Sequence, residues 1–161
     1  MWLIEKYIKY GVIFVVLWAL LFLQLNYGCS KVKSMQMQPL MDNEKYFVYK
    51  KSSDMDDLKT GSIIYYERAY RGLKEIDMVG RVVAREGERI RIESGNVILD
   101  GTALAEAYVN EDNRFSESFE EIQVPKGHVY VMNDNRRLPT MPDSRRFGPL
   151  WAKSIIGIIK E

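Results

Sequence analysis

The sequence is poor in the residue types that build metal centres and disulfide frameworks. Its 161 residues contain one cysteine, Cys29, and one histidine, His128. A disulfide within the chain needs two cysteines, and metal sites made of cysteine or histidine need several such ligands, so both are excluded. We therefore expect no bound metal and no cofactor.

Proline and glycine are also scarce, with 5 and 11 residues, while hydrophobic residues make up 47% of the chain. This composition is typical of a packed core and not of a disordered chain. The length is sufficient for one domain and a short additional segment.

The sequence also lacks a large excess of charge of either sign, because the formal net charge is +1. This charge comes from the first 29 residues, where Lys6 and Lys9 outnumber Glu5. The remainder holds 21 basic and 21 acidic residues, from totals of 23 and 22. The overall charge gives no reason to expect a nucleic-acid partner.

One long apolar run is present, reading YGVIFVVLWALLFLQLNY from Tyr10 to Tyr27 without a charged residue. As a helix it would span roughly 27 Å, close to the thickness of a bilayer core. We predict a helix from about Ile8 to Tyr27 and a membrane anchor over residues 1–28. Two alternatives stay open, a cleaved signal peptide and a lipoprotein lipidated at Cys29, although residues 26–28 suit neither processing site well.

The basic residues beside the apolar run do not decide its orientation clearly. Lys6 and Lys9 precede the run, whereas Lys31 and Lys33 follow it. With the free amino group included, the amino-terminal side of the run carries slightly more positive charge, which predicts an amino terminus inside the cell. We therefore expect a single-pass protein of the cell membrane with its domain on the extracytoplasmic side.

The sequence after Cys29 is typical of a mainly β domain, over residues 29–161. Short apolar or alternating runs separated by turn residues indicate half-buried strands. The Asp100-Gly101 pair is a strong signal for a tight hairpin turn. The predicted strands cover Tyr46–Tyr49, Ser62–Tyr66, Arg81–Ala84, Arg89–Glu93, Val97–Leu99, Val129–Met132 and Ile155–Ile159.

Three separated stretches carry the most distinctive motifs. Asn133–Arg136 reads NDNR and is followed by DSRRFG at Asp143–Gly148. Val79–Glu88 reads VGRVVAREGE, and Met37–Pro39 reads MQP shortly after the apolar run. By their sequences and their order along the chain, the three stretches resemble the bacterial type I signal peptidases, the S26-type family. The resemblance implies a coiled β-sheet domain at the membrane surface that cleaves signal peptides with a serine–lysine dyad.

The two dyad positions lack the side chains that this chemistry needs. In the family, the nucleophile stands in a Ser-Met-x-Pro motif, and the lysine directly precedes the arginine of the second stretch. Aligned in this way, Gln36 stands at the nucleophile position and Gly80 at the base position. A serine needs an adjacent base, and a lysine acts as one only where burial lowers its pKa. We therefore predict a pseudo-enzyme.

Other departures lie beside the dyad. The family's second serine corresponds to Met141, with Thr140 next to it, and the glycine before Asp-Asn-Arg corresponds to Asn133. Around them the scaffold positions match, and we expect an ion pair between Asp143 and Arg145. The residues expected to line a peptide groove or to keep a structural role are Met37, Pro39, Arg81, Asp134, Asn135, Arg136, Thr140, Met141, Asp143, Ser144 and Arg145.

Ser34 offers an alternative nucleophile, because Ser34-Met35 is itself a Ser-Met pair. Pro39 would then follow after an insertion, and a displacement of about 1 Å can cost orders of magnitude in rate. A base is still lacking, since Lys74 lies far from Gly80 along a strand and Lys33 would point to the opposite face from Ser34. His128 matches a scaffold histidine of the bacterial enzymes.

Three functional hypotheses follow. In the first, the chain resembles the signal-peptidase-like proteins without a dyad that accompany sortase-assembled pili in Gram-positive bacteria. It would hold an extended segment of an exported protein or pilin by strand addition, as an accessory or chaperone. In the second, the chain is an active signal peptidase that uses Ser34. In the third, it is a lipoprotein scaffold. Arg137 and Arg146 could contact phospholipid headgroups.

Overall fold

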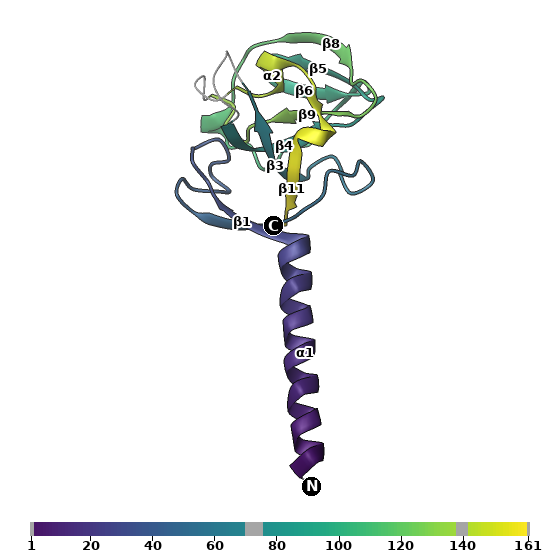
Figure 1. The fold of residues 1–161 in the computed structure, drawn as a ribbon. Coiled ribbons are helices and arrows are strands. Elements are labelled where there is room, and N and C mark those ends of the chain that lie inside the picture. Colours follow the sequence, from purple (N-terminus) through teal and green to yellow (C-terminus); the bar gives the residue numbers. More distant parts are fainter. Residues whose placement is uncertain (1, 70–75, 138–141, 161) are drawn as a thin grey trace.

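The computed structural model describes residues 2–69, 76–137 and 142–160. It is mainly β, as predicted, with one long amino-terminal helix (Figure 1). The elements are α1 (Trp2–Asn26), β1 (Tyr27–Lys31), β2 (Tyr46–Lys50), β3 (Ile63–Arg68), β4 (Ile76–Ala84), β5 (Arg89–Glu93), β6 (Asn96–Leu99), β7 (Thr102–Ala103), η1 (Glu111–Asn113), β8 (Phe119–Gln123), β9 (His128–Met132), α2 (Ser144–Phe147), β10 (Leu150–Trp151), η2 (Ala152–Ser154) and β11 (Ile155–Ile159).

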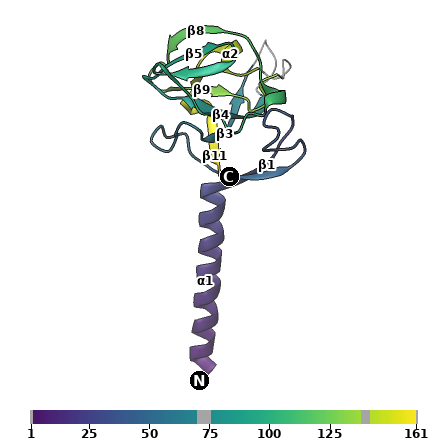
Figure 2. The ribbon, with the colours of Figure 1, turned by 180° about the vertical axis from the view of Figure 1, so that it is seen from behind.

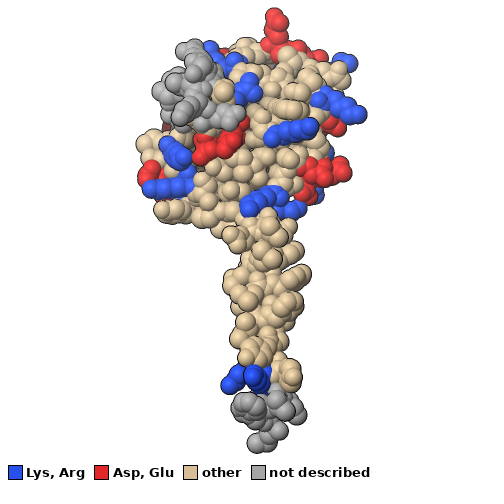
Figure 3. Space-filling model, viewed as in Figure 1, with Lys and Arg blue, Asp and Glu red and all other residues tan. Residues whose placement is uncertain are grey.

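Helix α1 projects from one end of the β domain in both views (Figures 1 and 2). Its segment Lys6–Asn26 is long and apolar enough to cross a membrane and is not buried against the rest of the chain. The face of the helix seen in Figure 3 shows no charged side chain beyond the basic ones near its start. The helix begins before the predicted Ile8, because residues 2–9 contain no proline or glycine that would interrupt it.

The β domain begins directly where α1 ends. Strand β1 pairs with β2, with Tyr27 opposite Lys50 and Gly28 opposite Tyr49. The predicted boundary between residues 28 and 29 therefore falls inside β1. The Asn26 carbonyl also accepts a hydrogen bond from the backbone N–H of Lys51 at 2.8 Å, so the end of the helix is tied to the domain.

The strands form two antiparallel sheets. The seven-stranded sheet has the order β1-β2-β11-β3-β4-β9-β10, and the four-stranded sheet has the order β7-β6-β5-β8. In Figures 1 and 2 the four-stranded sheet lies at the end of the domain away from α1, together with α2.

Strand β3 lies at the centre of the larger sheet and is buried on both faces. Ile64 and Tyr66 pack into one core cluster with Met78, Val82 and Val131. Ile63 and Tyr65, which alternate with them, pack into another cluster that includes Met37 and Val79. This is why the sequence reads as a continuous apolar run here and does not alternate.

The tight turns follow the sequence signals. Asp100 and Gly101, between β6 and β7, have φ angles of 45° and 81°. Ser94 and Gly95, between β5 and β6, have φ angles of 47° and 84°. Positive φ at both central residues suits the right-handed twist of a two-residue hairpin, which explains why each turn contains a glycine.

Several short elements were not predicted. Strand β8 reads FEEIQ, and four of its five residues are exposed. It pairs on one side with β5 and lies at the edge of its sheet, so its sequence shows no buried face. Helix α2 spans one turn and is stabilised by the Asp143 carboxylate, which accepts a hydrogen bond from the Arg145 N–H.

Candidate functional site

Gln36 is buried between β4 and the segment that follows β9. The whole residue is only 2% exposed. Its Oε1 accepts a hydrogen bond from the Val79 N–H at 3.3 Å, and its backbone carbonyl accepts one from the Asn135 N–H at 2.8 Å. The Asn135 side chain also donates to the Met35 carbonyl at 3.3 Å. The structure therefore brings Gln36 together with two of the three sequence motifs.

Gln36 bonds to an open part of strand β4. β4 pairs with β3 from Ile76 to Arg81, but its pairing with β9 begins at Arg81. The Val82 N–H donates to Ser62 on the β3 side. Because antiparallel strands alternate their hydrogen bonds between two neighbours, the Val79 N–H faces the other edge. Among the described residues no strand covers that edge, and the Gln36 carboxamide occupies the place of a strand partner.

Gly80, the residue at the predicted base position, faces a filled core. It lies opposite Ile64 of β3. An ideal Cβ at Gly80 would lie 2.5 Å from Val131 Cγ1 and 3.4 Å from Tyr66 Cε1. Val131 is fully buried, and its branched side chain has few alternative rotamers in a strand. The space that a lysine would need beside β4 is therefore taken by Val131 and Tyr66.

Ser34 lies next to the candidate site, but no described base contacts its hydroxyl. Its Oγ accepts a hydrogen bond from the Gln36 N–H at 3.4 Å. The neighbouring Lys33 forms an ion pair with Asp77 at 3.0 Å, and its side chain is 63% exposed. The Lys33 ammonium is therefore engaged by a carboxylate and by water, and not by Ser34. Lys74 lies outside the described residues.

His128 lies in β9, where it pairs with Trp151 of β10. Its Nδ1 lies 2.9 Å from the carbonyl oxygen of Lys126, at hydrogen-bond distance. This contact gives the ring a local structural role in the turn before β9.

Arg81 and Asp134 form a buried ion pair beside the site. The guanidinium donates to both carboxylate oxygens, at 2.9 and 2.8 Å, and Nη1 donates to the Gly61 carbonyl at 2.9 Å. Arg81 also lies over the Tyr108 ring, 4.1 Å from its centroid. Burial raises the pKa of the Asp134 carboxyl, and the hydrogen-bonded Arg81 opposes that rise. The pair thus links β4 to the segment after β9.

A second network holds the DSR motif. Asp143 forms the predicted ion pair with Arg145, at 2.7 Å, and accepts a hydrogen bond from the Asn133 N–H at 3.0 Å. The Ser144 hydroxyl accepts one from the Val131 N–H at 2.8 Å. Arg136 donates to the Asn133 carbonyl at 2.7 Å and pairs with Glu106. These side chains hold the segment Asp143–Arg145 against β9 and the residues that follow it.

The remaining predicted site residues are distributed differently. Met37 is fully buried in the core cluster with Tyr65 and Val79, so it packs against the floor of the site. Pro39 is exposed in the loop after it. Thr140 and Met141 lie outside the described residues.

Sequence reasoning missed the partners supplied by the segment before η1. No role was predicted for Glu106 or Tyr108 from the sequence. The structure pairs Glu106 with Arg136 and stacks Tyr108 on Arg81. Both residues lie in a turn closed by a hydrogen bond from the Val109 N–H to the Glu106 carbonyl at 3.0 Å, so strand or helix periodicity could not have identified them. Within the described ranges, no group of three His, Cys, Asp or Glu residues is placed to hold a metal ion.

Comparison with known proteins agrees with this geometry. The model of the signal peptidase family, peptidase S26, matches residues 4–161. Signal peptidase I T of Bacillus subtilis is 28% identical over 167 residues, covering 97% of this chain and 84% of the relative. Signal peptidase I of Bacillus licheniformis is 28% identical over 161 residues, covering 94% and 84%.

The fold itself also has a solved counterpart. A crystal structure of a signal peptidase I from Enterococcus faecalis superposes with a TM-score of 0.52 at 23% identity, covering 63% of this chain and 96% of that one. With the apolar helix α1, the family match indicates single-pass membrane anchoring. Because the match extends over almost the whole sequence, this chain belongs to the signal peptidase family, peptidase S26.

Proposed function

We propose that this chain is a non-catalytic member of its family, which holds an extended segment of an exported protein or pilin as an accessory or chaperone. The observation that carries the proposal is the environment of Gln36. A carboxamide hydrogen-bonded to the Val79 N–H stands where the alignment expects a nucleophilic serine. It cannot be activated by a base or carry an acyl intermediate.

The Gly80 position supports the same conclusion from the other half of the dyad. A base must come within hydrogen-bond reach of the nucleophile. At Gly80 there is no side chain, and Val131 and Tyr66 fill the adjacent space. The buried ion pairs Arg81–Asp134 and Asp143–Arg145 hold the scaffold together without either dyad side chain.

The open edge of β4 is the surface that we propose for client binding. Ile76–Gly80 pair with β3 and, among the described residues, have no strand on the other side. Apart from the Val79 N–H, which donates to Gln36, such an edge can accept an extended peptide through backbone hydrogen bonds. In this proposal residues 1–28 anchor the protein, and residues 29–161 form the binding domain outside the cytoplasm.

The first test is a cleavage assay with the full chain in liposomes and a preprotein that carries a signal peptide. Signal peptidase I T of Bacillus subtilis, in the same liposomes, is the positive control. We expect no cleavage product above background, and no change in the Ser34→Ala variant. A serine-directed acylating probe followed by mass spectrometry should leave the chain unlabelled.

The rival function is an active signal peptidase that uses Ser34. Its relatives carry that name, and the Ser34 hydroxyl lies 3.4 Å from the Gln36 N–H, beside the candidate site. Turnover that disappears in Ser34→Ala would establish this function and refute the proposal above.

The proposed topology has its own test. Protease added to intact protoplasts should digest the β domain, because the proposal places residues 29–161 outside the cytoplasm. Immunoblotting with an antibody against the domain follows the digestion, and a cytoplasmic protein serves as the control for leakage. A domain that stays intact until the membrane is lysed would show the opposite orientation.

A further inference from the structure

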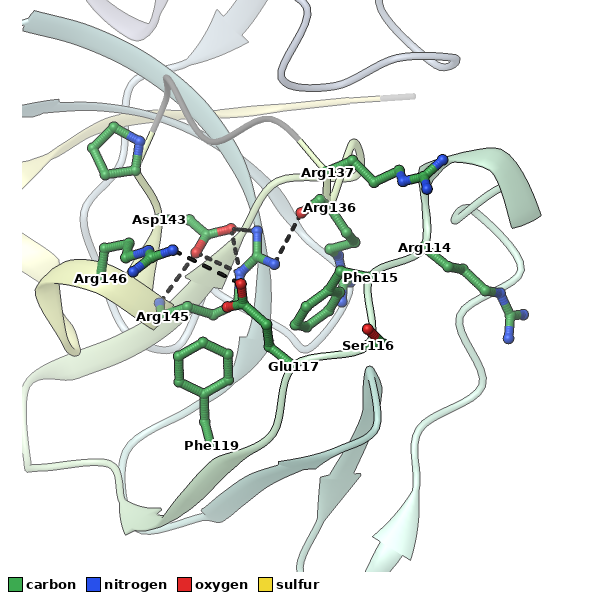
Figure 4. Close-up of a pocket in the computed structure, with 11 residues that line it drawn as sticks. Arg114, Phe115, Ser116, Glu117, Phe119, Arg136, Arg137, Asp143, Arg145 and Arg146 are labelled. Atoms are coloured by element: carbon green, nitrogen blue, oxygen red, sulfur yellow. Dashed lines mark hydrogen bonds and ion pairs between the residues drawn. The ribbon is translucent and has the colours of Figure 1, made fainter.

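A basic pocket of about 480 Å³ lies away from Gln36 and Gly80, between the segment that leads into β8 and the segment around α2. In both ribbon views β8 and α2 lie at the end of the domain opposite α1 (Figures 1 and 2). The side chains that surround the pocket are shown in Figure 4 and include five arginines, Arg114, Arg136, Arg137, Arg145 and Arg146.

Two of these arginines hold the fold together. Arg136 is buried and pairs with Glu106. Arg145 pairs with Asp143, donates to the Arg136 carbonyl at 3.0 Å, and lies over the Phe115 ring at 4.4 Å from its centroid. Most N–H groups of these two guanidinium groups donate to other parts of the protein. We therefore treat Arg136 and Arg145 as the structural wall of the pocket and not as its ligand-binding groups.

The other three arginines are exposed and poorly neutralised. Arg114 forms no ion pair with any residue that the structure describes, and Arg137 donates to the backbone carbonyl of Asp112 at 3.0 Å. Arg146 is 61% exposed and lies 3.9 Å from Glu117, a weak pair. These three side chains, which we call the rim arginines, can bind a ligand without breaking a buried contact.

The charge around the pocket is uneven. Five arginines face Asp143, Glu117 and the Arg136 partner Glu106, which leaves an excess of two positive charges. The chain from residue 30 onward is balanced overall, with 21 basic and 21 acidic residues. The positive charge is therefore concentrated locally at this pocket.

The arrangement suits a ligand with several separated negative charges. Figure 4 shows Arg146 on one side of the pocket and Arg114 and Arg137 on the other, with the rings of Phe115 and Phe119 between them. An acidic peptide can place carboxylates against both groups of arginines and an apolar side chain against the rings.

We infer that this pocket binds an acidic peptide segment of a partner protein, at a second surface separate from the β4 edge. The position favours a protein partner over an anionic lipid headgroup, because the pocket lies at the opposite end of the domain from the membrane helix (Figure 1). The alternative in which Arg137 and Arg146 contact phospholipid headgroups is less compatible with this position in the fold.

The test uses the full chain in detergent and a short fluorescein-labelled peptide that alternates glutamate with leucine. Fluorescence anisotropy should show binding, which should be absent for the same peptide with lysine in place of glutamate. The variant Arg114→Glu/Arg137→Glu/Arg146→Glu should bind the acidic peptide at least about tenfold more weakly. The single variant Arg146→Gln should show a smaller loss in the same direction.

A matched control separates the pocket from the general field of the protein. Lys59→Glu/Lys126→Glu/Lys153→Glu makes the same change in net charge at exposed lysines outside the pocket. It should leave the affinity within about threefold. Near-UV circular dichroism should be unchanged in both triple variants.

Four results would overturn the inference. They are no binding of the acidic peptide, an equal loss in both triple variants, complete displacement of the peptide by millimolar inorganic phosphate, and arginine-dependent binding to phosphatidylglycerol vesicles without binding to the peptide. None of them bears on the catalytic test of Ser34, so the two proposals fail separately.

Discussion

Replacing Arg81 with alanine is expected to lower the free energy of unfolding by about 3–5 kcal/mol. The Asp134 side chain is fully buried, and Arg81 supplies both of its charge-assisted hydrogen bonds. Removing the guanidinium leaves a carboxylate in the interior without its cation. Urea denaturation of the full chain in mild detergent, followed by near-UV circular dichroism, measures the loss.

The matched control is Arg89→Ala, at a side chain that is 65% exposed and 4.0 Å from Glu121. Its effect should stay within about 0.5 kcal/mol. The double variant Arg81→Leu/Asp134→Leu should recover most of the loss, because it removes both buried charges. A loss below about 1 kcal/mol in Arg81→Ala would show that the pair is not the main link between β4 and the segment after β9.

The same variant should have a characteristic pH dependence. Burial already raises the pKa of Asp134, and removing Arg81 removes the group that opposes the rise. A carboxyl whose folded pKa exceeds its unfolded value stabilises the fold at low pH, and that contribution is lost as the pH rises through the folded pKa. The deficit of Arg81→Ala relative to the native chain should therefore shrink as the pH falls.

Placing a lysine at Gly80 is expected to destabilise the chain by about 3 kcal/mol or more. The Cβ alone would lie 2.5 Å from Val131 Cγ1, and overpacking of this kind costs about 1–3 kcal/mol. The ammonium group adds the cost of burying a charge without a partner. Denaturant titration of Gly80→Lys and Gly80→Ala in the full chain separates the two contributions.

A double-mutant cycle tests whether Val131 causes the clash. Val131→Ala should lower the free energy of unfolding by itself, because it leaves a cavity. Combined with Gly80→Ala it should cost less than the sum of the two single changes, since the new methyl group occupies the vacated space. Strict additivity would mean that the core accommodates Gly80→Ala by another route.

This result also bears on the restored dyad Gln36→Ser/Gly80→Lys. The two substitutions return the chemical groups but not the space for the lysine chain. A third substitution, Val131→Ala, would remove the side chain that lies closest to a Cβ at Gly80 and so make space for the lysine. Acylation by a serine-directed probe should therefore be absent from the double variant.

The sequence by itself determined the parts of this protein that depend on local chemistry. The uncharged run from Tyr10 to Tyr27 predicted the helix, because an apolar segment in a bilayer must satisfy its own backbone hydrogen bonds, and a helix does so within the segment. The Asp100-Gly101 turn and the apolar run at Ser62–Tyr66 predicted elements whose signals lie within a few residues. The motifs around Gln36, Gly80 and Asp134 identified the family, because their order along the chain is itself the evidence.

Only the tertiary structure decided what surrounds those residues. Gln36 meets the Val79 N–H across 43 positions, and Gly80 meets Val131 across β4 and β9. The basic pocket combines the segment before β8, which supplies Arg114, with residues 136–146, which supply the other four arginines. Such contacts depend on sheet order and register, which local patterns do not encode, because any strand with a buried face can in principle pair with several others.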